Sequence, residues 1–304
     1  MNKQTTHRRG WRRIAAWTTA VFVSLGALTV AFTFGWLADI RPNAVRDGIS
    51  EQEEVRGREL LAELARSHGL DRWHSHESLQ VEMSDTWFGP IGLAMNPWAV
   101  QSQEIRLGVQ VGSWTTRMEL MNGPNAGDVW GVQDMNAYFA RGDGPAEFDP
   151  DPDISVAMPA DFLAPTFQYF FELPLRIESA SVVAWAGEAE RDGQQYDLVY
   201  ATWGSPEPQR HIDQYLIWIN RETGRADRVE HTIRDLASSG MGAIVYSGHQ
   251  ERDGVHFPRR GEAVVVFPGG ASASLHVMIW QEPRFDAVAL SELRPDPERV
   301  ARRK

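Results

Sequence analysis

Two histidines and a glutamate, in the run His74-Ser75-His76-Glu77, are the side chains whose types and spacing best suit chemistry. In an extended segment His74 and His76 point to the same side, so two imidazoles and a carboxylate could bind a metal ion. A further ligand has to come from elsewhere, and the spacing selects none of the candidates His211, His231, His249 and His256. A polar segment between a helix and a strand explains the same residues, and we therefore predict no metal site.

Other catalytic patterns are missing from the sequence. With 41 acidic residues in the chain, carboxylate pairs like those of glycosidases arise by chance, and none has a distinctive setting. Ser238-Ser239-Gly240 lacks the Gly-x-Ser-x-Gly pattern of a nucleophile elbow, and no glycine-rich phosphate loop follows a strand. There is no cysteine, which excludes disulfides, thiolate metal sites and attachment of lipid to a cysteine. We predict no catalytic residue and no cofactor.

Charge is distributed unevenly along the 304 residues. Residues 1–38 hold five of the 30 basic residues and none of the 41 acidic ones. The remainder therefore carries 25 basic and 41 acidic residues, a net charge of −16. Such a surface repels phosphate groups, so we expect no nucleic-acid partner.

An apolar segment follows the basic N-terminus, residues 1–13. Residues 14–38 are free of charge, and as a helix they exceed the ~30 Å of a bilayer's hydrocarbon core. The preceding basic residues predict a cytoplasmic N-terminus. We expect a single-pass anchor in the inner (cytoplasmic) membrane, with a cleaved signal peptide or a buried soluble helix as alternatives. If the segment is an anchor or a signal peptide, residues 39–304 are periplasmic or otherwise extracytoplasmic.

Two helices are expected after the linker, residues 39–49. Ser50 and Glu53 form the capping box of a helix that should run to about residue 68 and end at Gly69. An aromatic helix is expected at 160–172. Its prolines predict boundaries at Pro159 and Pro174 and a kink at Pro165.

The domain as a whole covers residues 50–282. Outside the two helices it has the alternating pattern of antiparallel strands. Early strands are predicted at 79–87, 105–111, 114–120 and 128–134. A meander with glycine-bearing turns follows from 180–188 to 272–281, which is typical of a meandering sheet or barrel. The charged, proline-containing tail, residues 283–304, is expected to fray.

The order of these parts resembles the LolA/LolB-type lipoprotein-carrier fold. Phe162-Leu163 through Leu173-Pro174 is similar to that fold's inter-sheet helix, and Asp213–Gly224 (DQYLIWINRETG) to its strand–turn–strand hairpin. Glu188–Val199 and Gly254–Pro258 resemble hairpins of uncharacterised bacterial relatives. The resemblance covers roughly residues 50–270. Its departures, the missing lipobox cysteine and the apolar segment, favour a membrane-tethered relative over a freely shuttling carrier.

The resemblance implies a mainly β (α+β) domain, in which a curved antiparallel sheet or half-barrel is covered by two helices. It also implies an apolar cavity suited to acyl chains. We predict that an aromatic and methionine set lines this cavity: Trp87, Trp98, Trp114, Met118, Trp130, Phe167, Phe170, Trp185 and Trp218. The same residues could simply fill the core. The apolar segment 88–100 is expected to act as a lid or to touch lipid.

These observations favour a non-catalytic, membrane-tethered protein that binds a lipid or an acylated ligand. A sensor or assembly module that binds an envelope protein is the first alternative. An extracytoplasmic hydrolase is the second.

Overall fold

The computed structural model describes residues 36–148, 160–267, 271–296 and 298. The predicted membrane segment, residues 14–38, lies outside the described residues except for its last three positions. Within the described ranges, no helix combines the length and the apolar character needed to cross a bilayer. The anchor stays a prediction from the sequence.

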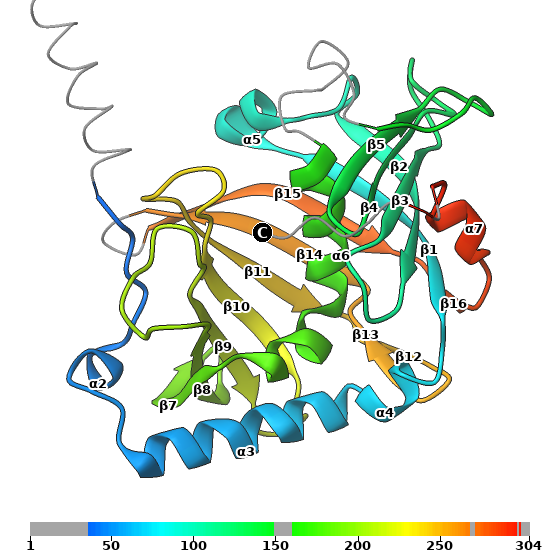
Figure 1. Cartoon of the computed structure of the whole chain (residues 1–304). Coiled ribbons are helices and arrows are strands. Elements are labelled where there is room, and N and C mark those ends of the chain that lie inside the picture. The colour runs from blue at the N-terminus through cyan, green and yellow to red at the C-terminus, as the bar shows by residue number, and fades with distance from the viewer. Residues whose placement is uncertain (1–35, 149–159, 268–270, 297, 299–304) are drawn as a thin grey trace, which may run out of the picture.

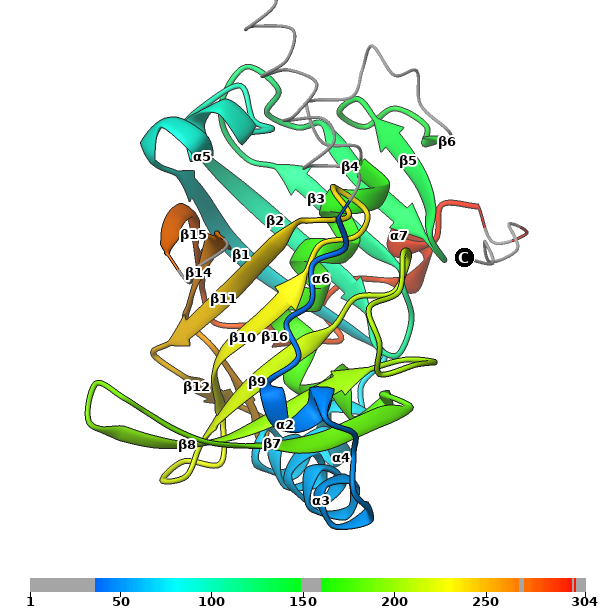
Figure 2. The same ribbon diagram turned by 90° about the vertical axis from the view of Figure 1, so that its left-hand side faces the viewer.

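One large antiparallel sheet curves around a central helix (Figures 1 and 2). Its first meander contains β1 (Ser78–Trp87), β2 (Ser102–Gln110), β3 (Thr116–Leu120), β4 (Val129–Gln133), β5 (Asn136–Ala140) and β6 (Glu147–Phe148). Its second contains β7 (Val182–Arg191), β8 (Gln194–Thr202), β9 (Tyr215–Asn220), β10 (Ala226–Thr232), β11 (Met241–Ser247), β14 (Arg260–Val266) and β15 (Ser272–Trp280). Two short strands, β12 (Gln250–Arg252) and β13 (Val255–Phe257), form a separate pair.

The two meanders join where β1 pairs with β15, with Met83 opposite Trp280. The strand order is β6-β5-β4-β3-β2-β1-β15-β14-β11-β10-β9-β8-β7. Because β6 and β7 end this order without pairing to each other, the sheet stays open. The mainly β, curved and antiparallel architecture predicted from the sequence is therefore confirmed.

The first long helix, α3 (Glu51–Ser67), lies across one end of the sheet against β7 (Figure 1). The predicted capping box is present, because the Ser50 side chain accepts from the Glu53 N–H and the Glu53 carboxylate accepts from the Ser50 N–H. Gly69 follows the helix with φ +84°, as expected for a left-handed cap. Gly57 packs so closely on β7 that a Cβ would lie 2.7 Å from the Ala184 carbonyl carbon.

The second long helix, α6 (Ala160–Arg176), runs along the concave face of the sheet (Figure 2). The prediction that it ends before Pro174 is wrong, since the helix continues to Arg176. A proline at position 174 removes the N–H that the Phe170 carbonyl would normally accept from. The Tyr246 hydroxyl donates to that carbonyl instead, at 2.7 Å, so the helix passes through the proline without an unpaired acceptor.

The short elements close the ends of the fold. The helices are α2 (Asn43–Arg46), α4 (Leu70–Trp73), α5 (Gly89–Met95), η2 (Ile177–Ser179) and α7 (Leu290–Leu293), and the last strand is β16 (Arg284–Phe285). The linker predicted at 39–49 contains α2, whose Val45 is buried. Residues 284–296 do not fray, because β16 pairs with β1 and Leu293 is fully buried.

Candidate functional site

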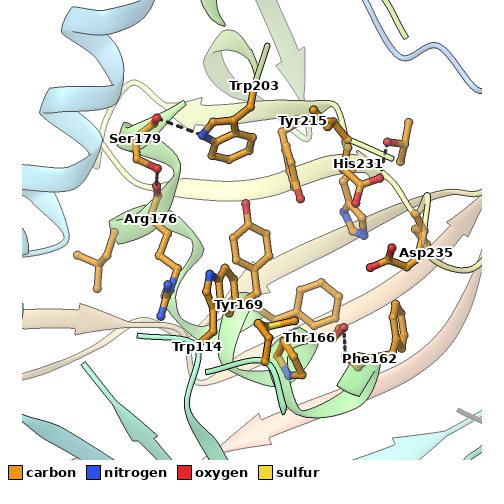
Figure 3. A pocket seen from close by; sticks show the side chains of 18 of the residues that line it. Trp114, Phe162, Thr166, Tyr169, Arg176, Ser179, Trp203, Tyr215, His231 and Asp235 are labelled. Carbon is orange, nitrogen blue, oxygen red and sulfur yellow. Dashed lines mark hydrogen bonds between the residues drawn. The ribbon is translucent and has the colours of Figure 1, made fainter. Parts of the chain in front are cut away.

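A cavity of about 970 Å³ lies between α6 and the inner faces of β9 and β10 (Figure 3). This volume is at the upper end of the ~300–1,000 Å³ range of small-molecule sites. Its wall is rich in aromatic side chains: Trp73, Trp114, Phe162, Tyr169, Phe170, Trp203 and Tyr215. A pocket of this size is large enough for a small molecule or part of a lipid chain.

The spacing of residues on α6 produces one wall of this cavity. Phe162, Thr166 and Tyr169 follow one another at intervals of four and three residues, so they share one helix face. Packing turns the opposite face toward the sheet, where Phe167 and Phe171 are almost completely buried. The helix therefore has two apolar faces, one packed in the core and one that lines the cavity.

The facing wall comes from two adjacent strands. Tyr215 on β9 is the register partner of His231 on β10, and their rings stack with centroids 6.2 Å apart. The Tyr215 ring also meets Tyr169 edge to face at 5.7 Å. Figure 3 shows the two phenol groups directed toward one another across the space. Trp203 completes this wall, 6.0 Å from Tyr215.

Three polar aromatic side chains that line the cavity, Tyr169, Tyr215 and His231, are uncharged at neutral pH. Burial raises the pKa of Tyr169 and that of Tyr215 above the ordinary tyrosine value. Burial also lowers the pKa of His231 to about 4, against the Val229 carbonyl, which favours its charged form. These three groups can exchange neutral hydrogen bonds with a ligand, but they present no fixed charge.

Two of the charged groups that line the cavity, Arg176 and Asp213, are paired within the protein. Arg176 lies over the Trp114 ring at 4.2 Å, donates to the Ser113 carbonyl at 2.6 Å and pairs with the buried Glu172. The Asp213 carboxylate accepts from the Thr232 hydroxyl at 2.8 Å and from the Arg234 N–H at 2.9 Å. These bonds hold neighbouring segments of the cavity wall together. Those of Asp213 agree with the structural role in its hairpin that the sequence suggests.

The structure brings two of the nine predicted cavity residues, Trp114 and Phe170, to the cavity wall. Met118 and Trp130 are buried in the main core. Trp185 donates to Asp197 at 3.0 Å, and Trp218 meets the Tyr196 ring, away from the cavity. The remaining three predicted residues, Trp87, Trp98 and Phe167, belong to a packed cluster in the core.

That cluster surrounds a fully buried carboxylate, Asp85. One of its oxygens accepts from the indole N–H groups of Trp87, at 2.7 Å, and Trp98, at 2.6 Å. The other lies 2.6 Å from Nδ1 of His276, whose ring stacks on Trp87 at 4.2 Å. Because a carboxylate only accepts, His276 must carry the hydrogen on Nδ1. The two indoles and the imidazole therefore bond Asp85 in the core and do not line the cavity.

The histidines considered as metal ligands separate into three places. His74, His211 and His231 line the cavity, whereas His76 bonds Asp286 at 2.9 Å. His249 and His256 both lie beside His68: the His249 ring is 5.8 Å from the His68 ring, and the His256 carbonyl is 3.0 Å from Nδ1 of His68. Across the described ranges, no three His, Asp or Glu side chains are arranged to hold a metal ion.

Sequence reasoning missed Tyr169, Tyr215, His231, Trp203 and Arg176 as cavity residues. A signal for Tyr169 was present, since it lies in the aromatic helix, three residues after Thr166. The segment 88–100, expected as a lid, contributes no residue to the cavity wall. It contains α5, which packs on β15 instead.

Comparison with family models and with curated proteins gives no match for the chain. Among solved structures, a DUF1329 family protein from Desulfovibrio piger aligns with a TM-score of 0.52 at 10% identity, covering 79% of this chain and 97% of that one. A LolA superfamily protein from Nitrosomonas europaea has a TM-score of 0.48 at 11% identity, covering 78% and 96%. A putative outer membrane lipoprotein-sorting protein domain from Vibrio parahaemolyticus has 0.48 at 10%, covering 80% and 97%. These likenesses concern the fold.

Proposed function

We propose that this chain, which has a LolA/LolB-like fold, binds a lipid or an acylated ligand in the cavity beside α6 and performs no chemistry on it. The observation that carries the proposal is the cavity of about 970 Å³ beside α6, whose aromatic lining includes Tyr169 and Tyr215. Aromatic side chains with neutral polar tips suit a ligand that is mostly apolar but contains an ester or amide group.

The driving force for loading is apolar burial. Each CH₂ group moved out of water is worth about 0.8 kcal/mol, and a bilayer already supplies that burial. A carrier must therefore offer an apolar environment comparable with lipid, and hydrogen bonds for the polar end. The phenol groups of Tyr169 and Tyr215, neutral at pH 7 and with pKa values that burial raises further, supply polar groups inside such an environment.

We place the domain on the extracytoplasmic side of the inner membrane, held by residues 14–38 as a single-pass helix. The length and composition of that segment support this position. Tethering keeps the cavity close to its ligand and raises the local concentration of both.

Substituting Thr166→Trp is expected to lower ligand capture about tenfold, because an indole in the cavity displaces roughly two CH₂ groups of ligand. The full chain is reconstituted in vesicles containing a phospholipid with a diazirine on its acyl chain, and adducts are mapped by mass spectrometry after irradiation. We expect adducts on α6 between Phe162 and Tyr169, with the Thr166→Trp variant strongly depleted.

The matched control is Glu63→Trp, which adds the same side chain on the exposed face of α3. This variant should label like the parent chain. Equal labelling of the parent and the Thr166→Trp variant, or adducts restricted to positions outside the cavity, would contradict lipid binding. An envelope protein partner would then be the better explanation.

A further inference from the structure

Exposed apolar side chains gather at one end of the sheet. Nine large apolar side chains are exposed within the described residues, and seven of them belong to this end. The other two, Val55 on α3 and Ile279 near the far end of β15, lie elsewhere. Scattered exposed apolar residues are normal on soluble proteins, but a concentration at one end marks a contact surface.

Three of the seven belong to the α5 segment. Phe88, Ile91 and Leu93 are 41%, 43% and 51% exposed. The segment is fastened by its backbone: the Phe88 N–H donates to the Leu275 carbonyl at 2.9 Å. A Cβ at Gly92 would lie 2.3 Å from that carbonyl oxygen, so α5 sits directly on β15. The apolar side chains are thus held outward by a fixed support.

The other four come from separate segments: Trp36, Met121, Leu236 and Phe267. Met121 follows β3, Leu236 follows β10 and Phe267 follows β14. Antiparallel pairing brings the C-terminal ends of these strands to the same end of the sheet as the C-terminal end of β1, where α5 begins. We call these seven side chains the apolar rim.

The chain enters the domain at this same end. The Ala38 N–H donates to the Ser238 carbonyl at 2.9 Å, and the Arg234 guanidinium donates to the Ala38 carbonyl. The predicted membrane segment ends at residue 38, so no free linker separates it from the loop that holds Leu236. Figures 1 and 2 show the described chain starting beside this end of the sheet.

We propose that the apolar rim inserts into the surface of the bilayer in which the N-terminal segment is anchored. The inference rests on the proposed membrane anchor, but it does not require that the cavity hold a lipid. A net charge of −16 on residues 39–304 offers no general attraction to anionic lipid, so insertion depends on the apolar side chains. They would reach the boundary of headgroups and acyl chains, about 5–10 Å deep.

The rim also adjoins the cavity. Ile233 and Asp235 line the cavity, and Leu236, the next residue, belongs to the rim. Phe162, near the start of α6, extends the apolar wall in the same direction (Figure 3). A rim seated in lipid would therefore place one margin of the cavity at the membrane surface.

The test uses single cysteines, which the absence of native cysteine allows. Leu93→Cys and Val55→Cys, at positions with 51% and 52% exposure, are labelled with the environment-sensitive dye NBD in the full chain. The chains are reconstituted in phosphatidylcholine vesicles with or without a lipid that carries a doxyl quencher near its headgroup. Phe267→Cys provides a second rim position from a different segment.

We expect the dyes at positions 93 and 267 to be quenched several-fold more than the dye at position 55. Equal quenching at the three positions would overturn the proposal, as would a chain that fails to float with the vesicles. A bright dye at position 93 that doxyl lipid does not quench would also overturn it and would indicate a protein contact. Diazirine labelling within the cavity is measured separately, so a failure of lipid binding is distinguishable from a failure of rim insertion.

Discussion

The Asp85→Ala variant is expected to lose about 3–5 kcal/mol of unfolding free energy, because it leaves buried donors without an acceptor. The two indoles and the imidazole that bond Asp85 lie 2.6–2.7 Å from its oxygens, and none can reach water without disrupting the core. The substitution also leaves a small cavity beside the Trp87 and Trp98 rings. Denaturant unfolding of the full chain in detergent micelles, followed by tryptophan fluorescence, measures the loss.

Glu82→Ala is the matched control, since it removes a carboxylate from the same strand. Glu82 is 53% exposed and lies 3.6 Å from Arg106, so its removal should change the free energy by about 1 kcal/mol or less. If the two alanine variants unfold at the same denaturant concentration, the buried carboxylate does not organise the core.

The Arg176→Met variant is expected to be less stable by about 3–5 kcal/mol at pH 7, because it leaves the fully buried Glu172 without its cation. Glu172 has few other partners: the Gln168 amide donates to its oxygens at 3.1 and 3.2 Å. Restoring neutrality in the double variant Arg176→Met/Glu172→Gln should recover most of the loss. The measurement is the same unfolding experiment.

This deficit should depend on pH. Burial raises the pKa of Glu172 above its ordinary value, whereas Arg176 lowers it, so removing Arg176 raises the pKa further. A carboxyl with a raised pKa binds more protons folded than unfolded, and stability therefore falls as pH rises above about 4.3. The variant should approach the parent at acidic pH and differ most at neutral pH. A deficit that is the same at pH 5 and pH 7 would refute this explanation.

Local rules in the sequence predicted the helices and most strands. The capping box at Ser50 and Glu53 and the glycine at position 69 fixed both ends of α3, because those signals act within a few residues. Pro174 misled the prediction of the end of α6, since the compensating hydroxyl of Tyr246 comes from a distant strand. The pairing of β1 with β15 likewise has no local signal.

The sequence predicted that an aromatic cavity exists, but it did not predict most of the residues that line it. Alternation indicates which strand residues face inward, but it does not indicate where α6 leaves space unfilled. From the sequence, Trp87 and Trp98 look like aromatic residues that could line a cavity. In the structure both bond the buried Asp85, together with His276 from a strand far away in the sequence. Tyr215 and His231 line the wall because β9 and β10 face the Phe162–Tyr169 side of α6, a long-range arrangement that has no local signal.

The junction of β1 with β15 has a consequence for biosynthesis. The strand β1, which ends at Trp87, pairs with β15, which ends at Trp280. The middle of the sheet therefore cannot form until nearly the whole polypeptide has been synthesised. Until then each meander presents an unsatisfied strand edge, which is a template for wrong pairing and aggregation. Such long-range closure is slow. A chain with this topology therefore leaves the edge of β1 exposed until its last long strand, β15, has been synthesised.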